Sequence, residues 1–201
     1  MRLQIRGNYD DDARELRRLL SDLGPLHAAP RHQKWRLRLQ PVTYLGPGAI
    51  AVLSTAVLMG RHLRQAPKVV MPDGPRELLR FCDSCGFTRP VARAQHTAAD
   101  DWDTMPLEQF ATASWTLAGT VVALIQRHVS LSTDDEEVLC MCINEVIQNV
   151  EDHAASRVGG VLAARWMGGR GEVRIAVVDR GKGVLESYAC TTRIFQAPKT
   201  P

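Results

Sequence analysis

Hydrophobic and polar positions in the first half of the chain predict strands and helices in alternation. Residues 35–42 (WRLRLQPV) alternate apolar and polar side chains, which is the pattern of a half-buried strand. Residues 49–63 are almost uniformly apolar and predict a helix. Residues 68–71 (KVVM) predict a short buried strand, and residues 76–84 predict a helix that ends before Gly86. This alternation favours a parallel or mixed sheet.

Charged and breaker residues define the region before this pattern. Residues 10–23 predict a short charged helix, because three aspartates stand at its start, where the helix dipole favours carboxylates. Gly24 and Pro25 predict its end. Residues 27–34 predict a loop.

The second half predicts two helices followed by a hairpin. Thr133 and Glu136 have the spacing of a capping box, so a helix is expected to open there. The expected elements are helices over 111–128 and 133–155, and strands over 161–167 and 172–179 joined by a glycine-rich turn.

The chain is therefore expected to be an α/β protein in two parts. Polar residues 92–106, with three aspartates, mark the boundary between them. The expected segments are an N-terminal helix and linker (1–34), a small α/β domain (35–92), a linker (93–109) and a second α/β domain (110–201).

Charge supports the division into two parts. The whole chain carries +3, but the first hundred residues carry +7 and the remainder −4. We interpret the basic half as a solvated cationic surface, with attraction of an acidic partner as the alternative. Nucleic acid is not an expected partner, because no long Lys/Arg run and few aromatic residues are present.

Composition also predicts where the protein works. The first 18 residues contain no apolar signal-peptide core, and the apolar stretch 49–60 is shorter than the roughly 20 residues that span a bilayer. We expect a cytoplasmic protein without a membrane partner. Five cysteines, an odd number, fit reduced thiols. Cys82 and Cys85 form a CxxC pair, for which zinc or redox chemistry is the alternative to core packing.

The helix sequence INEVIQNVEDHA (143–154) carries polar groups that suit a ligand. Glu145 and Asn149 are four residues apart and so neighbours on one helix face, and Asp152 and His153 follow. An Asn oxygen suits Mg²⁺, and a Glu can deprotonate a water or hydroxyl. A solvated helix face is the alternative. The apolar face is expected to comprise Leu139, Cys142, Ile143, Val146 and Val150.

A second polar motif follows the apolar strand 173–178. Its sequence is Asp179-Arg180-Gly181-Lys182-Gly183. Glycines without a Cβ let the backbone approach a flat ring closely. Asp179, expected to be buried at the strand end, could accept a hydrogen bond from an exocyclic amine.

In this order, the two motifs resemble the N box and first glycine box of the GHKL superfamily (gyrase, MutL, histidine kinases and their relatives), over roughly residues 110–188. The resemblance implies a Bergerat ATP-binding fold. It implies that Asn149 coordinates the Mg²⁺ on ATP and that Glu145 is the general base in an ATPase or serine/threonine kinase. It implies that Asp179 binds the adenine amine and that Gly181 and Gly183 shape its pocket. Asp152 and His153 match positions where some members contact phosphate or metal.

The end of the chain departs from that pattern. Eighteen residues follow Gly183 and none is glycine, so we expect an incomplete domain without the phosphate-covering lid. The expected function is ATP/Mg²⁺ binding in a regulatory protein of the anti-sigma or serine-kinase kind. The alternative is a non-catalytic interaction module with a degenerate or truncated site. Exposed apolar surface would then favour a homodimer or a regulatory protein partner.

Residues 35–87 resemble a STAS-type domain, the fold of anti-sigma-factor antagonists. The shared features are a strand, a glycine-containing turn, an apolar helix, the KVVMP strand and a helix that ends at Gly86-Phe87. In those antagonists a Ser or Thr at the start of the first helix is phosphorylated. The matching turn, 45–49, has no hydroxyl, and Ser54 and Thr55 lie inside the helix, so we expect a scaffold or interaction role.

Overall fold

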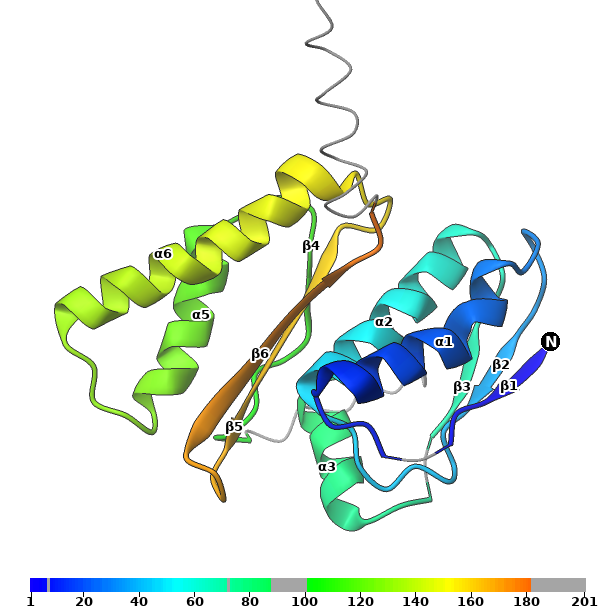
Figure 1. Cartoon of the computed structure of the whole chain (residues 1–201), viewed down its shortest axis with the longest axis horizontal. Coiled ribbons are helices and arrows are strands. Elements are labelled where there is room, and N and C mark those ends of the chain that lie inside the picture. The colour runs from blue at the N-terminus through cyan, green and yellow to red at the C-terminus, as the bar shows by residue number, and fades with distance from the viewer. Residues whose placement is uncertain (7, 72, 88–100, 182–201) are drawn as a thin grey trace, which may run out of the picture.

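Two three-stranded sheets and the helices that cover them make up the described part of the chain (Figure 1). The structure is a computed structural model that describes all residues except 7, 72, 88–100 and 182–201. The protein belongs to the α/β class, with a parallel sheet first and an antiparallel sheet second. Within the described residues, no helix combines the length and the apolar character that crossing a bilayer requires.

Three short parallel strands form the first sheet in the order β1-β2-β3. They are β1 (Arg2–Gln4), β2 (Arg36–Arg38) and β3 (Lys68–Val70). The alternation expected around β2 is confirmed, since Leu37 and Leu39 are buried while Arg36 and Arg38 are exposed. Strand β1 was not anticipated, and it brings the N-terminal residues into the sheet.

The helices of this first part are α1 (Ala13–His27), α2 (Pro47–His62) and α3 (Arg76–Ser84). Helices α1 and α2 connect the parallel strands and lie on the same side of the sheet (Figure 1). Helix α3 has the predicted bounds, and Gly86 follows it with φ 76°, a conformation that glycine adopts without strain.

Helix α1 does not end where the sequence predicted. Its N-cap is Asp12, whose carboxylate accepts a hydrogen bond from the Glu15 amide at 2.8 Å. The helix then passes through Gly24 and Pro25 and ends at His27. A residue before proline normally avoids helical geometry because its Cβ meets the proline ring, and glycine has no Cβ. Leu26 is also buried, so tertiary packing stabilises the last turn.

Helix α2 lies between the two sheets (Figure 1). Thirteen of its sixteen residues are buried, which explains why its sequence is apolar on every side. One side packs in the core shared with α1 and the first sheet. On the other side Ala51 packs against Val161 and Ala163 of the second sheet.

The second sheet is antiparallel, in the order β4-β5-β6. Its strands are β4 (Glu108–Phe110), β5 (Gly160–Met167) and β6 (Glu172–Asp179), and its helical segments are α5 (Trp115–Gln126), α6 (Thr133–Asn149) and the π-helix η1 (Val150–Ala154). The β5–β6 hairpin is confirmed, whereas β4 begins in the last two residues of the expected linker (93–109). Helices α5 and α6 cover the face opposite α2 (Figure 1).

Helix α6 differs from the expectation at its start and on its buried face. The capping box begins one residue earlier than predicted, with Ser132 as N-cap and Asp135 as its reciprocal partner. Cys142 and Val146, expected inside, are exposed, and Ile147 is fully buried instead. Val146 and Ile147 are adjacent apolar residues, so helical spacing alone did not decide which one faces the sheet.

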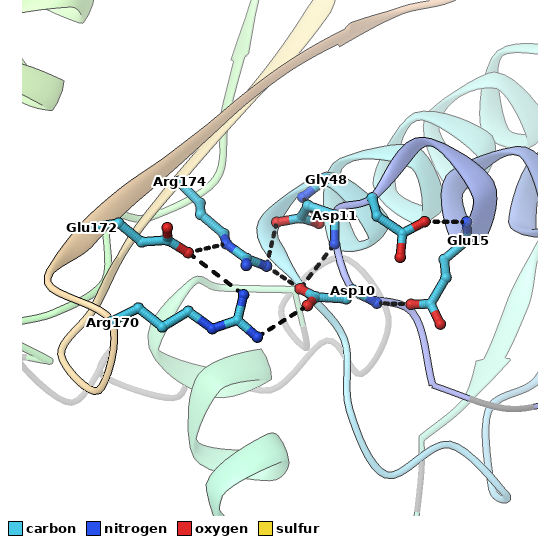
Figure 2. Close-up of polar contacts among 8 residues, drawn as sticks. Asp10, Asp11, Glu15, Gly48, Arg170, Glu172 and Arg174 are labelled. Carbon is cyan, nitrogen blue, oxygen red and sulfur yellow. Dashed lines mark hydrogen bonds and ion pairs between the residues drawn. The ribbon is translucent and has the colours of Figure 1, made fainter.

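An ionic cluster joins the N-terminal segment to the β5–β6 hairpin (Figure 2). Arg174 of β6 contacts the Asp10 carboxylate and donates from Nε to Glu172 at 2.9 Å. Arg170 of the hairpin turn lies 3.5 Å from Asp10. Partial burial raises the pKa of Asp10, but the hydrogen bond and charge of Arg174 outweigh it, and the pKa lies below its ordinary value.

The carboxylate of Asp11 caps helix α2 from outside that helix. Gly46, the N-cap position of α2, has no side chain to do so, and the Gly48 amide donates to Asp11 at 2.9 Å. A Cβ on Gly46 would lie 2.3 Å from an Asp11 oxygen, so glycine is needed for this approach. Burial raises the pKa of Asp11, and the hydrogen bond from the Gly48 amide partly offsets that effect.

The approach of Gly60 to Trp35 gives a test of the packing under α2. A Cβ at Gly60 would lie 2.7 Å from the Trp35 ring, which is held by a 3.1 Å hydrogen bond to Gln65. We expect Gly60→Ala to lower the free energy of unfolding by roughly 1–2 kcal/mol, because overpacking exceeds the gain in helix propensity. Gly119→Ala in α5, with open space around it, should raise stability by about 0.5–1 kcal/mol. Urea unfolding measures both, and equal effects would contradict this account.

The ionic cluster gives a pH-dependent test. We expect Arg174→Leu to cost about 1–3 kcal/mol of unfolding free energy at pH 7, because partly buried carboxylates lose their cation. Since the pKa of Asp10 is depressed when folded, the wild-type advantage is lost as the pH falls through that pKa, below the usual 3.8. Urea unfolding at pH 7 and pH 2 measures the change. Arg170→Leu, at a side chain 58% exposed, should cost less than about 0.5 kcal/mol. A cost for Arg174→Leu that is the same at both pH values would contradict the assignment.

Candidate functional site

The candidate site begins with the exposed face of α6. Glu145 and Asn149 lie four residues apart on that face, as predicted, and both side chains are exposed. Within the described residues, neither side chain forms a hydrogen bond or salt bridge with another residue. Both groups are therefore open to a ligand or to solvent.

The helix changes geometry directly after Asn149. Residues Val150–Ala154 form the π-helix η1, and Ala155 then has a left-handed backbone with φ 50°. Such π-helical turns are rare in proteins as a whole, but many of those known lie at functional sites. The wider turn redirects the side chains that follow it. Asp152 and His153 lie on this turn and are exposed. Because the turn is π-helical, they do not continue the α-helical spacing of Asn149.

One contact fixes η1 to the neighbouring helix. The Ala113 amide, just before α5, donates a hydrogen bond to the Glu151 carboxylate. The π-helix therefore has its own anchor next to the exposed residues. Neither this bond nor the π-helix was foreseen, because no local sequence signal marks either one.

The second motif lies at the end of β6. Asp179 accepts a hydrogen bond from the Gly181 amide at 2.7 Å, which closes a tight turn. The sequence predicted a buried carboxylate, but Asp179 is exposed. This prediction was wrong because β6 ends at the rim of the sheet, beyond the apolar positions that pack against the helices.

Gly181 brings the two motifs together. A Cβ at this position would lie 1.8 Å from the carbonyl oxygen of Ala154, so only glycine fits against the end of η1. The ends of α6 and β6 accordingly lie at the same end of the second sheet (Figure 1). Glycine was expected there to let the backbone approach a ring, and the observed neighbour is the backbone of η1. Gly183 lies outside the described residues.

Arg180 adds a cation that the sequence analysis did not assign. Its side chain is partly buried, and burial lowers the pKa of the guanidinium. No carboxylate in the described residues forms a salt bridge with it. A partly desolvated cation next to Asp179 attracts anionic groups such as phosphate.

The structure gives separate evidence on metal binding and on the chemistry of Cys82 and Cys85. In the described ranges, no group of three or more His, Cys, Asp and Glu residues could hold a metal ion. A Mg²⁺ ion at Asn149 would therefore depend on nucleotide phosphates and water for its other ligands. Cys82 and Cys85 are both buried, and burial raises the pKa of each thiol to about 12. Reactive thiols have lowered pKa values, so this pair packs as small apolar residues.

Two cavities in the described part of the chain are lined by residues outside the two motifs. One, of about 450 Å³, lies between α2, α3 and β4 and is lined by Leu58, Phe87 and Leu107 among others. Another, of about 540 Å³, lies between α5 and α6 and includes Trp115 and Met141. The candidate site lies apart from both cavities, where α6, η1 and the turn after β6 meet.

Comparisons with known proteins do not assign a function to the chain, so a function is inferred from these residues. The chain matches no known protein family, no curated protein and no solved structure. The resemblance to the GHKL superfamily remains a prediction carried by the helix motif and the turn after β6.

Proposed function

We propose that the protein is an ATP- and Mg²⁺-binding regulatory protein of the histidine-kinase-like GHKL type. The observation that carries the proposal is the packing of Gly181 against Ala154. It places the turn with Asp179 beside the π-helix that directly follows Asn149. Two motifs 30 residues apart in the sequence, each weak alone, meet at one edge of the second sheet.

The arrangement of elements supports the finer fold that this proposal requires. Two helices followed by two antiparallel strands, with both helices on one face of the sheet, suit an incomplete Bergerat-type sandwich. In the first part, a parallel sheet with its connecting helices suits a STAS-like domain. The combination fits a regulatory role in which the first part is a scaffold or interaction domain.

Each residue has a separate role in the proposed site. Asp179 accepts a hydrogen bond from the adenine amine, and Gly181 and Gly183 shape the adenine pocket. Asn149 supplies one oxygen to Mg²⁺, which otherwise keeps phosphate and water ligands. Glu145, one helical turn earlier, is placed to orient or deprotonate the attacking water or hydroxyl. Arg180 contributes positive potential for the anionic nucleotide.

Exposure of these side chains is compatible with binding. Among the described residues, Glu145, Asn149 and Asp179 have no partners on other elements that ATP would have to displace. The bond that the described residues make to Asp179 comes from the Gly181 amide, and it uses one of the two carboxylate oxygens. The second oxygen is free to accept from an adenine amine.

Calorimetric titration of ATP with and without Mg²⁺ tests the proposal. We expect Asp179→Asn to weaken ATP binding at least tenfold, because the carboxylate is the acceptor for the adenine amine. Asn149→Ala should abolish the Mg²⁺ dependence and retain part of the affinity. Gln148→Ala, an exposed neighbour on α6, is the control and should bind as wild type does. ATP binding that is undetectable, or unaffected by Asp179→Asn and Asn149→Ala, would refute the nucleotide site.

A non-catalytic interaction module is a second candidate, and exposed apolar surface favours it. Val138, Met141 and Val146 of α6 are each at least half exposed, and so is Trp115 of α5. These side chains flank the same face that carries Glu145. Such a patch is typical of a surface that a partner or a second copy covers.

Self-association distinguishes this second candidate. We expect sedimentation velocity to show concentration-dependent dimerisation that Met141→Lys and Val146→Lys weaken, because each places a charge in the apolar interface. Ser21→Lys adds the same charge at an exposed polar position of α1, away from α5 and α6, and should leave association unchanged. Dimerisation that ATP does not affect would favour the module, and a strictly monomeric protein would exclude the homodimer.

A further inference from the structure

The outer face of the first sheet carries an unusual concentration of positive charge. The strands alternate, so every second side chain points away from helices α1 and α2. Five exposed cations occupy that face or its end: Arg2, Arg6, Arg36, Arg38 and Lys68. No described element covers this side of the sheet (Figure 1).

Three of these cations stand in one row across the sheet. The strand register pairs Arg2 with Arg36 and Arg36 with Lys68. Neighbouring strands are about 4.8 Å apart, and like charges directly opposite each other destabilise a sheet. The row therefore has a cost in stability that the fold itself does not require, because any strand-forming residue would serve at an exposed position.

Counter-charge on this face is sparse. Within the described part of the chain, no salt bridge joins any of the five cations to a carboxylate. Arg38 donates to Gln40 at 2.8 Å, and Gln40 in turn donates to Asp73 at 3.0 Å. In the described part of the chain, the contact of Asp73 with the patch runs through the Gln40 amide, so Asp73 lies at the border of the patch. An anion from another molecule can therefore neutralise the positive potential of the row.

We propose that this face binds an extended acidic segment of a partner protein. Arg36 and Arg38 are two residues apart on one strand, so their spacing is about 6.6 Å. The carboxylates of alternate residues in an extended peptide have the same spacing. Each carboxylate can accept two hydrogen bonds from one guanidinium group. Nucleic acid fits less well, since the strands place no aromatic side chain on this face for base stacking. The surface is separate from the candidate nucleotide site, which lies on the second sheet.

Fluorescence anisotropy with a labelled ten-residue peptide of alternating Glu and Thr tests the inference. We expect salt-sensitive binding that Arg36→Glu/Arg38→Glu weakens at least tenfold. Arg14→Glu/Arg17→Glu changes the net charge equally on exposed positions of α1 and should alter affinity less than twofold. A peptide of the same composition with contiguous Glu residues should bind at least threefold more weakly.

Further measurements separate binding from folding and from other polyanions. Arg36→Thr/Arg38→Thr keeps strand propensity and relieves repulsion, so it should melt no lower than wild type while losing the peptide. The inference is overturned if the alternating peptide does not bind or if both charge-reversal pairs weaken it equally. Equal binding of the contiguous-Glu peptide overturns the matched spacing. Tighter binding of single-stranded DNA of equal charge overturns the choice of a protein partner.

Discussion

The rest of the fold depends on the burial of helix α2. Its sequence is apolar on all sides, so a single sheet would leave half of its surface in water. The structure covers one side with α1 and the first sheet and the other with the β5–β6 hairpin. Small residues such as Ala51 and Gly60 allow this close packing. The two parts of the chain consequently share a helix, and their outer surfaces face away from each other.

The elements that the sequence predicted well are those with long, regular patterns. Helix α2, helix α3 and the β5–β6 hairpin follow directly from their apolar runs and glycine turns. All four strands β1 to β4 have three residues, but β2 lies in the longer alternating stretch 35–42 and β3 in the apolar run 68–71. Strands β1 (RLQ) and β4 (EQF) each contain a single apolar residue, so neither was recognised. The continuation of α1 through Pro25 depends on Gly24 and on buried Leu26, so it reflects tertiary packing rather than local propensity.

The candidate site shows the same division between local and tertiary information. The spacing of Glu145 and Asn149 placed them on one exposed face without knowledge of the fold. The exposure of Asp179 and the contact of Gly181 with Ala154 depend on where two distant segments meet. The π-helix is stabilised in part by the Ala113 amide, 38 residues before Glu151, and no helical pattern in residues 143–154 could reveal it.

The cap that Asp11 places on α2 has a consequence for how this helix becomes ordered. The two residues that form the bond are 37 positions apart, so the first turn of α2 is complete only after the N-terminal segment has docked. Closing a loop of that length costs conformational entropy that a local cap would not. The order of events at the start of α2 is thereby coupled to assembly of the first sheet. The final geometry at the start of α2, the helix buried between the two sheets, therefore depends on a carboxylate from a distant part of the chain.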